Sequence, residues 1–299
     1  MSQQIKSLFL LAAMAAGIFG YKWLAELSFL SPYLISSMLL VTYCKVSIKD
    51  LHFSRLHWFL LGFQLIVSLV CYLCLSPIDA ILAQGVMISI FIPTANASPV
   101  IAGMLGGNVG VLATYLLLCN ICAAFVAPVY FSFMTQSADY SFWGTVIYIC
   151  KRVIPLIIGP LAIALIIEKL SKKLHSKIKK LQKLTFYLWN ITLVFVMAGA
   201  TKFIVEELES GVLTVSQVLV YMFAALVVCL FQFWLGRKIG RKYGDAVVGG
   251  QGLGQKNTIL AIWMTQHYLN PIACIVPAAY ILWQNIVNSV QIWQHKTEK

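Results

Sequence analysis

Residues 248–258 read VGGQGLGQKNT, and they interrupt an otherwise apolar segment that runs from 245 to 268. Each glycine weakens a helix by about 1 kcal/mol relative to alanine. Four glycines within six residues therefore predict that no stable helix forms here. The spacing also resembles part of a dinucleotide-binding fingerprint, but no predicted strand precedes it, which argues against a nucleotide site. Gln251, Gln255, Lys256 and Asn257 place polar groups inside this break.

A second break lies in the apolar segment 77–105, where residues 93–99 read PTANASP. Its two prolines remove backbone donors and clash with the preceding helical turn. Thr94, Asn96 and Ser98 add side-chain oxygens beside the carbonyls that lose their helical partners. In lipid, such backbone must be buried in protein or line a wet cavity, which predicts a site. The alternative is a simple proline kink whose carbonyls bond to its own serine and threonine.

The composition predicts that lipid surrounds the chain. Of its 299 residues, 60% are hydrophobic and only 11% are charged, whereas soluble domains have about 45–50% and about 25%. Ten apolar segments are long enough, or nearly so, to span a bilayer. They are 5–21, 30–47, 57–75, 77–105, 108–134, 143–170, 184–206, 214–236, 245–268 and 270–294. The predicted fold class is an all-α integral membrane protein with ten transmembrane helices. A cleaved signal peptide is the alternative for the first segment.

The charges predict a topology. The formal net charge is +12, but the basic residues fall between apolar segments, which indicates orientation rather than a nucleic-acid partner. With the N-terminus inside, 17 of the 22 basic residues lie in cytoplasmic connections, including seven lysines in 169–183. Both termini are therefore predicted to be cytoplasmic in a multi-pass protein of the cell inner membrane. The basic run is interpreted as a solvated linker that touches lipid headgroups, with a partner-binding helix as the alternative.

The segments divide into two units of five spans, 1–134 and 135–299, and the basic linker 169–183 lies between the sixth and seventh helices. An odd number of spans turns the second unit upside down relative to the first. The broken fourth helix then corresponds to the broken ninth. Paired interruptions at corresponding positions are the best sequence indicator of a transporter site. Two inverted repeats, with helices 4 and 9 crossing near the middle of the bilayer, are therefore predicted.

Lys256 is the most informative residue, because an ammonium at that depth costs at least about 2.5–3.5 kcal/mol on insertion scales. It could bind an anionic substrate, replace a bound metal cation, or release and regain a proton. The alternative is a lysine that snorkels to the membrane surface. Neither break contains Asp or Glu, and half-helix N-termini favour anions. The predicted substrate is therefore a small organic anion.

Residues 283–289 read WQNIVNS and carry further polar groups in the last span, with helix–helix hydrogen bonding as the alternative role. No catalytic residue, metal site or cofactor is predicted. Cys71 and Cys74, like Cys119 and Cys122, have a metal-like spacing, but cysteine is common as a small buried apolar residue. The predicted substrate- or ion-binding residues are Thr94, Asn96, Ser98, Gln251, Gln255, Lys256, Asn257, Gln284, Asn285 and Asn288.

These residues resemble the bile acid:sodium symporter family over nearly the whole chain. The matching motifs are residues 96–100 (NASPV) with 107–109 (GNV), residues 255–261 (QKNTILA) and residues 283–286 (WQNI). The resemblance implies ten spans, inverted repeats, crossing broken helices and transport of an organic anion. It leaves the substrate open, because the family spans sterol conjugates, keto acids and pantoate-like acids.

The chain departs from the family at the sodium sites that the resemblance implies. Pro99 stands where the family usually has Asn, Gly252 (or Gln251) where it has Glu, and Lys256 where it has Gln. Leu112 and Leu116 stand where fifth-helix hydroxyls are expected. We therefore expect a secondary transporter that works by alternating access, one helical bundle rocking against another, without the usual sodium sites and with proton coupling as an option.

Two function classes are alternatives to a secondary transporter. One is an ion or proton exchanger that titrates Lys256. The other is a membrane receptor or enzyme without transport, although the five histidines lie in connections or near segment ends and form no cluster with glutamates in the spans. The sequence predicts that the chain is not an enzyme, and it leaves the oligomeric state open.

Overall fold

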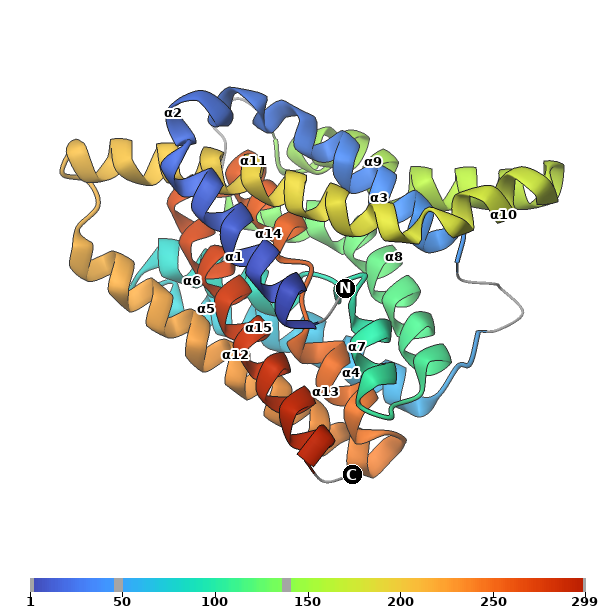
Figure 1. The fold of residues 1–299 in the computed structure, drawn as a ribbon. Helices are drawn as coiled ribbons and strands as arrows, with labels where there is room; N and C mark the ends of the chain where they lie inside the picture. Colours follow the sequence, from blue (N-terminus) through green and yellow to red (C-terminus); the bar gives the residue numbers. More distant parts are fainter. Residues whose placement is uncertain (1–2, 46–50, 136–140, 298–299) are drawn as a thin grey trace. The chain divides into compact units, whose positions relative to one another are not determined.

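The computed structural model describes residues 3–45, 51–135 and 141–297. Topology predictions that rest on Lys49, Asp139 and Lys299, or on the side chains of Lys6, Lys183 and Lys296, fall outside these residues. The described chain is helical throughout (Figure 1), and its β-structure is limited to one isolated bridge between Thr94 and Lys256. This confirms the predicted all-α class.

The chain forms two compact units, and each takes segments from both halves of the sequence. Unit 1 consists of residues 1–47, 124–214 and 262–272, and unit 2 of residues 48–123, 215–261 and 273–299. The predicted boundary at 134/135 separates two repeats in the sequence, whereas these units are defined by compactness. The repeat boundary therefore stays a prediction.

Unit 1 is built from helices that pack mainly around the long helix α11. Its complete helices are α1 (Gln3–Phe19), α2 (Tyr21–Leu24), η1 (Ala25–Leu30), α3 (Ser31–Tyr43), α9 (Phe142–Leu170), α10 (Lys172–Lys180) and α11 (Gln182–Glu209). Helices α1, α2, η1 and α3 contact α11, and α3 also contacts α9.

Unit 2 contains both predicted breaks. Its helices are α4 (Arg55–Gly62), η3 (Phe63–Val67), α5 (Ser68–Leu75), α6 (Ala80–Phe91), α7 (Ser98–Met104), the first part of α8 (Val109–Met134), α12 (Val215–Tyr243), α13 (Ala246–Gly254), the start of α14 (Thr258–Tyr268) and α15 (Ile275–Thr297). The short η4 (Pro271–Cys274) precedes α15. Helices α4, η3 and α5 form one continuous rod with a π-helical turn in its middle.

Seven segments of the described chain are long and apolar enough to cross a membrane. They are Tyr21–Tyr43, Arg55–Leu75, Val109–Met134, Phe142–Leu170, Leu184–Glu209, Val215–Tyr243 and Pro271–His295. The other three predicted spans are α1, which has only 17 residues, and the two segments that are interrupted. The chain is thus a multi-pass membrane protein, and ten spans in inverted repeats remain a prediction.

The glycine-rich stretch corrects the sequence analysis, because it is helical. Helix α13 continues through all four glycines to Gly254, and only residues 255–257 leave the helix. A Cβ atom on Gly249 would lie 2.1 Å from the carbonyl oxygen of Gly236 on α12. The glycines therefore allow two helix backbones to touch, as small residues do between membrane helices. This packing outweighs the weak helix propensity of glycine.

Two basic residues, Lys151 and Arg152, lie within a membrane-length helix. Helix α9 begins at Phe142, so both residues lie inside the helix with exposed side chains. The Arg152 guanidinium lies 4.7 Å from the centre of the Tyr148 ring, one turn before it.

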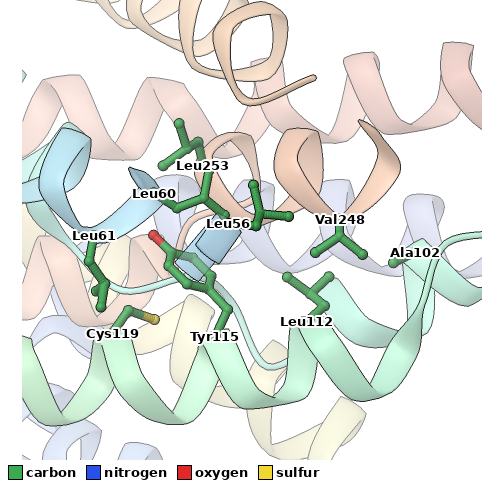
Figure 2. Packing of buried hydrophobic residues seen from close by; sticks show 9 residues of the cluster. All are labelled: Leu56, Leu60, Leu61, Ala102, Leu112, Tyr115, Cys119, Val248 and Leu253. Atoms are coloured by element: carbon green, nitrogen blue, oxygen red, sulfur yellow. The ribbon is translucent and has the colours of Figure 1, made fainter. Parts of the chain in front are cut away.

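An apolar cluster packs the first half of the second broken helix in unit 2. Figure 2 shows Leu112, Tyr115 and Cys119 of α8 pointing toward α4 and α13. The remaining members are Leu56, Leu60 and Leu61 of α4, Ala102 of α7, and Val248 and Leu253 of α13. Helix α13 is therefore held by side-chain packing on this face and by close backbone contact with α12 on another.

Candidate functional site

The two breaks pair with each other through their backbones. Ala95 N–H donates to the Gln255 carbonyl at 2.8 Å, and Asn257 N–H donates to the Pro93 carbonyl at 2.9 Å. This antiparallel bridge satisfies peptide groups that the helices leave unpaired, which lipid would not do. The first break is therefore not a simple proline kink, since its partner is the other broken helix.

Lys256 lies at the centre of this pairing and is buried. Its side chain is 1% exposed, and Nζ donates to the carbonyl oxygens of Ile90 at 2.7 Å and Ile92 at 3.1 Å. These carbonyls end α6, where the helix dipole is negative and favours a cation. Lys256 thus does not snorkel to a surface. Among the described residues, no Asp or Glu forms an ion pair with it.

The end of α13 receives hydroxyl groups instead of an ammonium. Thr94 Oγ1 donates to the Gln255 carbonyl at 2.8 Å, and it also lies 2.7 Å from Ser98 Oγ. Ser98 Oγ lies 3.3 Å from the same carbonyl. Thr94 and Ser98 are both buried, and they connect the first break to the C-terminal end of α13.

Of the three predicted site residues on α15, two bind the second break and the third, Asn285, does not. The Lys256 N–H donates to Gln284 Oε1 at 2.9 Å, while Asn288 accepts from Gln251 Nε2 at 2.8 Å and donates to Gln255 Oε1. Asn285 instead donates to the Ile281 carbonyl of its own helix. Gln284 and Asn288 lie four residues apart and share a face, so Asn285 points away from the break.

The remaining predicted residues lie just before the second half-helices. Asn257 precedes α14, and its Oδ1 accepts from Leu260 N–H at 3.4 Å. Asn96 lies before α7, and its Oδ1 is buried without a hydrogen-bond partner in the described structure. Gln251 Oε1 is another buried acceptor without a partner among these residues. The site therefore offers acceptors that its own hydrogen bonds do not use.

The model of the sodium bile acid symporter family matches residues 31–207, which include the first break. The chain belongs to the sodium bile acid symporter family. No curated protein sequence matches the chain. This is a family of membrane transporters rather than enzymes, which confirms the expectation that the chain is not an enzyme.

The second break and α15 lie outside residues 31–207, which match the symporter family, so their roles are inferred from the geometry of unit 2. That geometry reveals four residues that the sequence analysis missed. Gln64 donates to the Phe91 carbonyl at the end of α6 and accepts from Tyr115 Oη at 2.7 Å. Tyr280 Oη donates to the Gly254 carbonyl at 2.9 Å and accepts from Gln232 Nε2 at 3.0 Å.

These four residues occupy corresponding places in this symporter-family chain. Gln64 and Gln232 lie on the helices before the two broken ones, and Tyr115 and Tyr280 lie on the helices after them. A lone glutamine in an apolar span is a signal that sequence reading could have used, because such a group needs a partner.

An aspartate begins each broken helix. Asp79 Oδ1 accepts from the N–H groups of Ile81 and Leu82, and Asp245 Oδ1 accepts from those of Val247 and Val248. Each is an N-cap that satisfies donors of the first turn. Their second oxygens accept further hydrogen bonds at 2.8 Å, from Tyr221 Oη and from Asn108 N–H respectively.

No metal site accompanies the crossing in the part of the chain that the structure describes, where no group of three His, Cys, Asp or Glu side chains gathers. A pocket of about 310 Å³ lies elsewhere, in unit 1. Its lining residues are Tyr21, Lys22, Lys202, Val205, Glu206 and Glu209. None of the predicted site residues lines it.

Proposed function

We propose that this chain is a secondary transporter for a small organic anion, and that Lys256 supplies the positive charge for which other family members use sodium. The observation that carries the proposal is the hydrogen bonding of the Lys256 ammonium to the last carbonyls of α6. In transporters with broken helices, carbonyls at half-helix C-termini coordinate cations. An ammonium at such carbonyls occupies the place of a bound cation.

The surroundings support this role. Leu112 belongs to the apolar cluster of Figure 2, and Leu116 is fully buried. Neither supplies the hydroxyl oxygen that the family resemblance implies for sodium. A side chain at Gly252 would lie 3.2 Å from Leu60 and from the Tyr115 ring, so packing occupies the space beside the position where the family has glutamate. Hard cations need several oxygen ligands, and these positions offer none.

The anion has a separate place in the proposal. The first N–H groups of a helix lack intrahelical partners, and its N-terminal end is positive. Helix α14 begins at Thr258, directly after Lys256 and Asn257. We assign the substrate carboxylate to this end of α14, with the half-buried Asn96 and Asn257 beside it. Gln251 Oε1 is the acceptor for a hydroxyl or amine of the substrate.

Proton coupling is the second candidate, because Lys256 is a buried titratable group. A neutral amine keeps two N–H bonds, which suffice for the two carbonyls that Nζ contacts. Loss of a proton therefore does not require these bonds to break. Proton flux without substrate would favour an exchanger, whereas flux that requires substrate would favour symport.

The predicted topology belongs to the same proposal. The aspartate caps, the glutamines before each broken helix and the tyrosines after it recur in both halves of the chain, which supports two inverted five-helix repeats. The excess of basic residues in alternate connections supports cytoplasmic termini in a cell membrane.

The test measures thermal unfolding of the purified protein with a panel of carboxylates and sterol conjugates, in NaCl and in KCl. A ligand that binds the folded state raises the melting temperature. We expect a substrate to stabilise the wild type equally in both salts, and Lys256→Gln to bind it at least about tenfold more weakly unless Na⁺ is present. The control is Lys242→Gln, which removes an exposed lysine at the end of α12.

A wild type that responds only in NaCl, together with a Lys256→Gln variant that behaves in the same way, would show that Lys256 does not replace sodium. A set of organic cations is tested beside the panel, and stabilisation by these cations but by no anion would contradict the anion assignment instead.

A further inference from the structure

Helix α10 of unit 1 is held at a membrane surface by its connections. Ser171 alone separates it from the membrane-length helix α9, and Leu181 alone separates it from α11. Ser171 Oγ caps α10 by accepting from Leu174 N–H at 3.3 Å. Helix α10 also contacts α3, α9 and α11. Because both neighbouring helices are long and apolar enough to cross a bilayer, these nine residues are expected to stay near the lipid headgroups.

The residues of α10 divide into a basic and an apolar set. Its five lysines are all exposed, and the helix contains no acidic residue. They are Lys172, Lys173, Lys177, Lys179 and Lys180. Leu174 and Ile178 of α10, with Leu181 directly after it, recur at helical spacing, and Leu174 is 45% and Leu181 47% exposed. A short helix with this pattern binds in the plane of an anionic membrane surface.

A sixth lysine extends the basic surface. Lys45 lies two residues after α3, a helix that contacts α10, and its positive charge and that of Lys179 repel each other. Loss of water lowers the pKa of Lys45, and the charge of Lys179 lowers it further. No ion pair compensates either lysine in the described residues. An anion near both lysines would be attracted by both positive charges.

We propose that α10 and Lys45 form a binding surface for the phosphate groups of anionic phospholipids. The lysines contact the headgroup phosphates, and Leu174 and Leu181 enter the boundary between headgroups and acyl chains. The half-exposed leucines favour a lipid over a nucleic acid or a free anion, because only a lipid offers apolar contacts beside the phosphate. This surface lies in unit 1, and the inference does not depend on the proposed transport site.

The experiment titrates the purified full-length chain, in neutral detergent, with phosphatidylglycerol or with phosphatidylcholine of the same acyl chains, and follows the melting temperature. We expect phosphatidylglycerol to stabilise the wild type and phosphatidylcholine to have little effect. Replacing the five lysines of α10 by glutamine should raise the phosphatidylglycerol concentration for the same shift at least about tenfold, since each lysine near such a surface contributes about fivefold. Replacing them by arginine should preserve binding, which separates lost charge from lost folding.

The matched control removes basic residues elsewhere, in the triple variant Lys238→Gln, Arg241→Gln and Lys242→Gln at the exposed end of α12. We expect it to bind phosphatidylglycerol like the wild type. An equal loss in this control would overturn the assignment to α10. Equal stabilisation of the wild type by glycerol phosphate or heparin would identify a general polyanion site and would also overturn it, as would equal stabilisation by both lipids.

Discussion

Helices α6 and α13 have similar caps and neighbouring residues, but different groups donate to the carbonyls at their C-terminal ends. Each helix begins at an aspartate cap, is preceded by a helix with an inward glutamine, and is followed by a helix with a buried tyrosine. At the end of α6 the carbonyls receive the ammonium of Lys256. At the end of α13 they receive the hydroxyls of Thr94 and Tyr280.

This difference concerns the charge of the donor that each helix end receives. Neutral donors suffice to satisfy carbonyls at a helix end, and α13 demonstrates this. A buried ammonium costs several kcal/mol that hydroxyl groups do not, so stability alone gives no reason for Lys256. The proposed function gives such a reason, because a positive charge at one of the two ends favours the binding of an anion.

The largest expected effect breaks the packing of one half-helix. In Gly249→Ala, the added methyl group would lie 2.1 Å from the Gly236 carbonyl, so α13 and α12 must separate. We expect a loss of more than about 3 kcal/mol in folding stability or no folded protein at all. Gly252→Ala is the control on the same helix, because its methyl group meets only side chains, at 3.2 Å. Fluorescence size-exclusion chromatography and thermal unfolding would compare them, and equal behaviour would refute the close backbone packing.

Much of this arrangement could be predicted from the sequence. The prolines at 93 and 99 and the glycine-rich run located both broken helices, and most of the predicted segments agree with the helices to within a few residues. The extent of the second break could not be predicted, because it depends on Gly236, which lies on another helix. Local propensity is overruled there by tertiary packing.

The residues of the candidate site could be predicted only where regular helical periodicity applies. Gln284, Asn288 and Gln291 recur at i, i+4 and i+7, and all three bond to the second break. This periodicity was available in the sequence and would have favoured Gln291 over Asn285. The direction of the Gln64 side chain could not be predicted from the sequence. Gln64 lies in the π-helical turn of η3, where the usual helical periodicity fails.

The next largest effect removes the caps. Asp79→Ala and Asp245→Ala each lose a cap worth about 1 kcal/mol and a further hydrogen bond to a charged oxygen, so we expect each to cost about 2 kcal/mol. Similar losses of folding stability by thermal unfolding, within about 1 kcal/mol of each other, would support matched roles in the two halves. Asp79→Asn and Asp245→Asn should recover most of the loss, because asparagine caps helices as well as aspartate does. A large loss in only one of the alanine variants would contradict the correspondence.

A smaller effect should distinguish the two tyrosines. Tyr280 donates to a helix-end carbonyl and accepts from Gln232, whereas Tyr115 donates only to the side chain of Gln64. Hydrogen bonds between membrane helices are worth about 0.6 kcal/mol on average and up to about 1.7. We expect Tyr280→Phe to cost about 1.5 kcal/mol and Tyr115→Phe about 0.6, measured by thermal unfolding. The reverse order would show that the end of α6 depends on its tyrosine more than the end of α13 does.

An equally small effect is expected for the hydroxyl of Thr94, which lies opposite Lys256 in the bridge. Thr94→Val preserves shape but removes the hydrogen bond to the Gln255 carbonyl, which still accepts from Ala95 N–H. We therefore expect a loss of only about 0.6 kcal/mol. Thr94→Ser keeps the hydroxyl and should unfold like the wild type.

Because Thr94 and Lys256 face each other across the bridge, their variants give a direct test of the comparison. If the charge alone carries the function, Thr94→Val should bind the anion nearly as well as the wild type while Lys256→Gln does not. Equal losses of binding would mean that the bridge geometry, rather than the ammonium, is what the substrate requires.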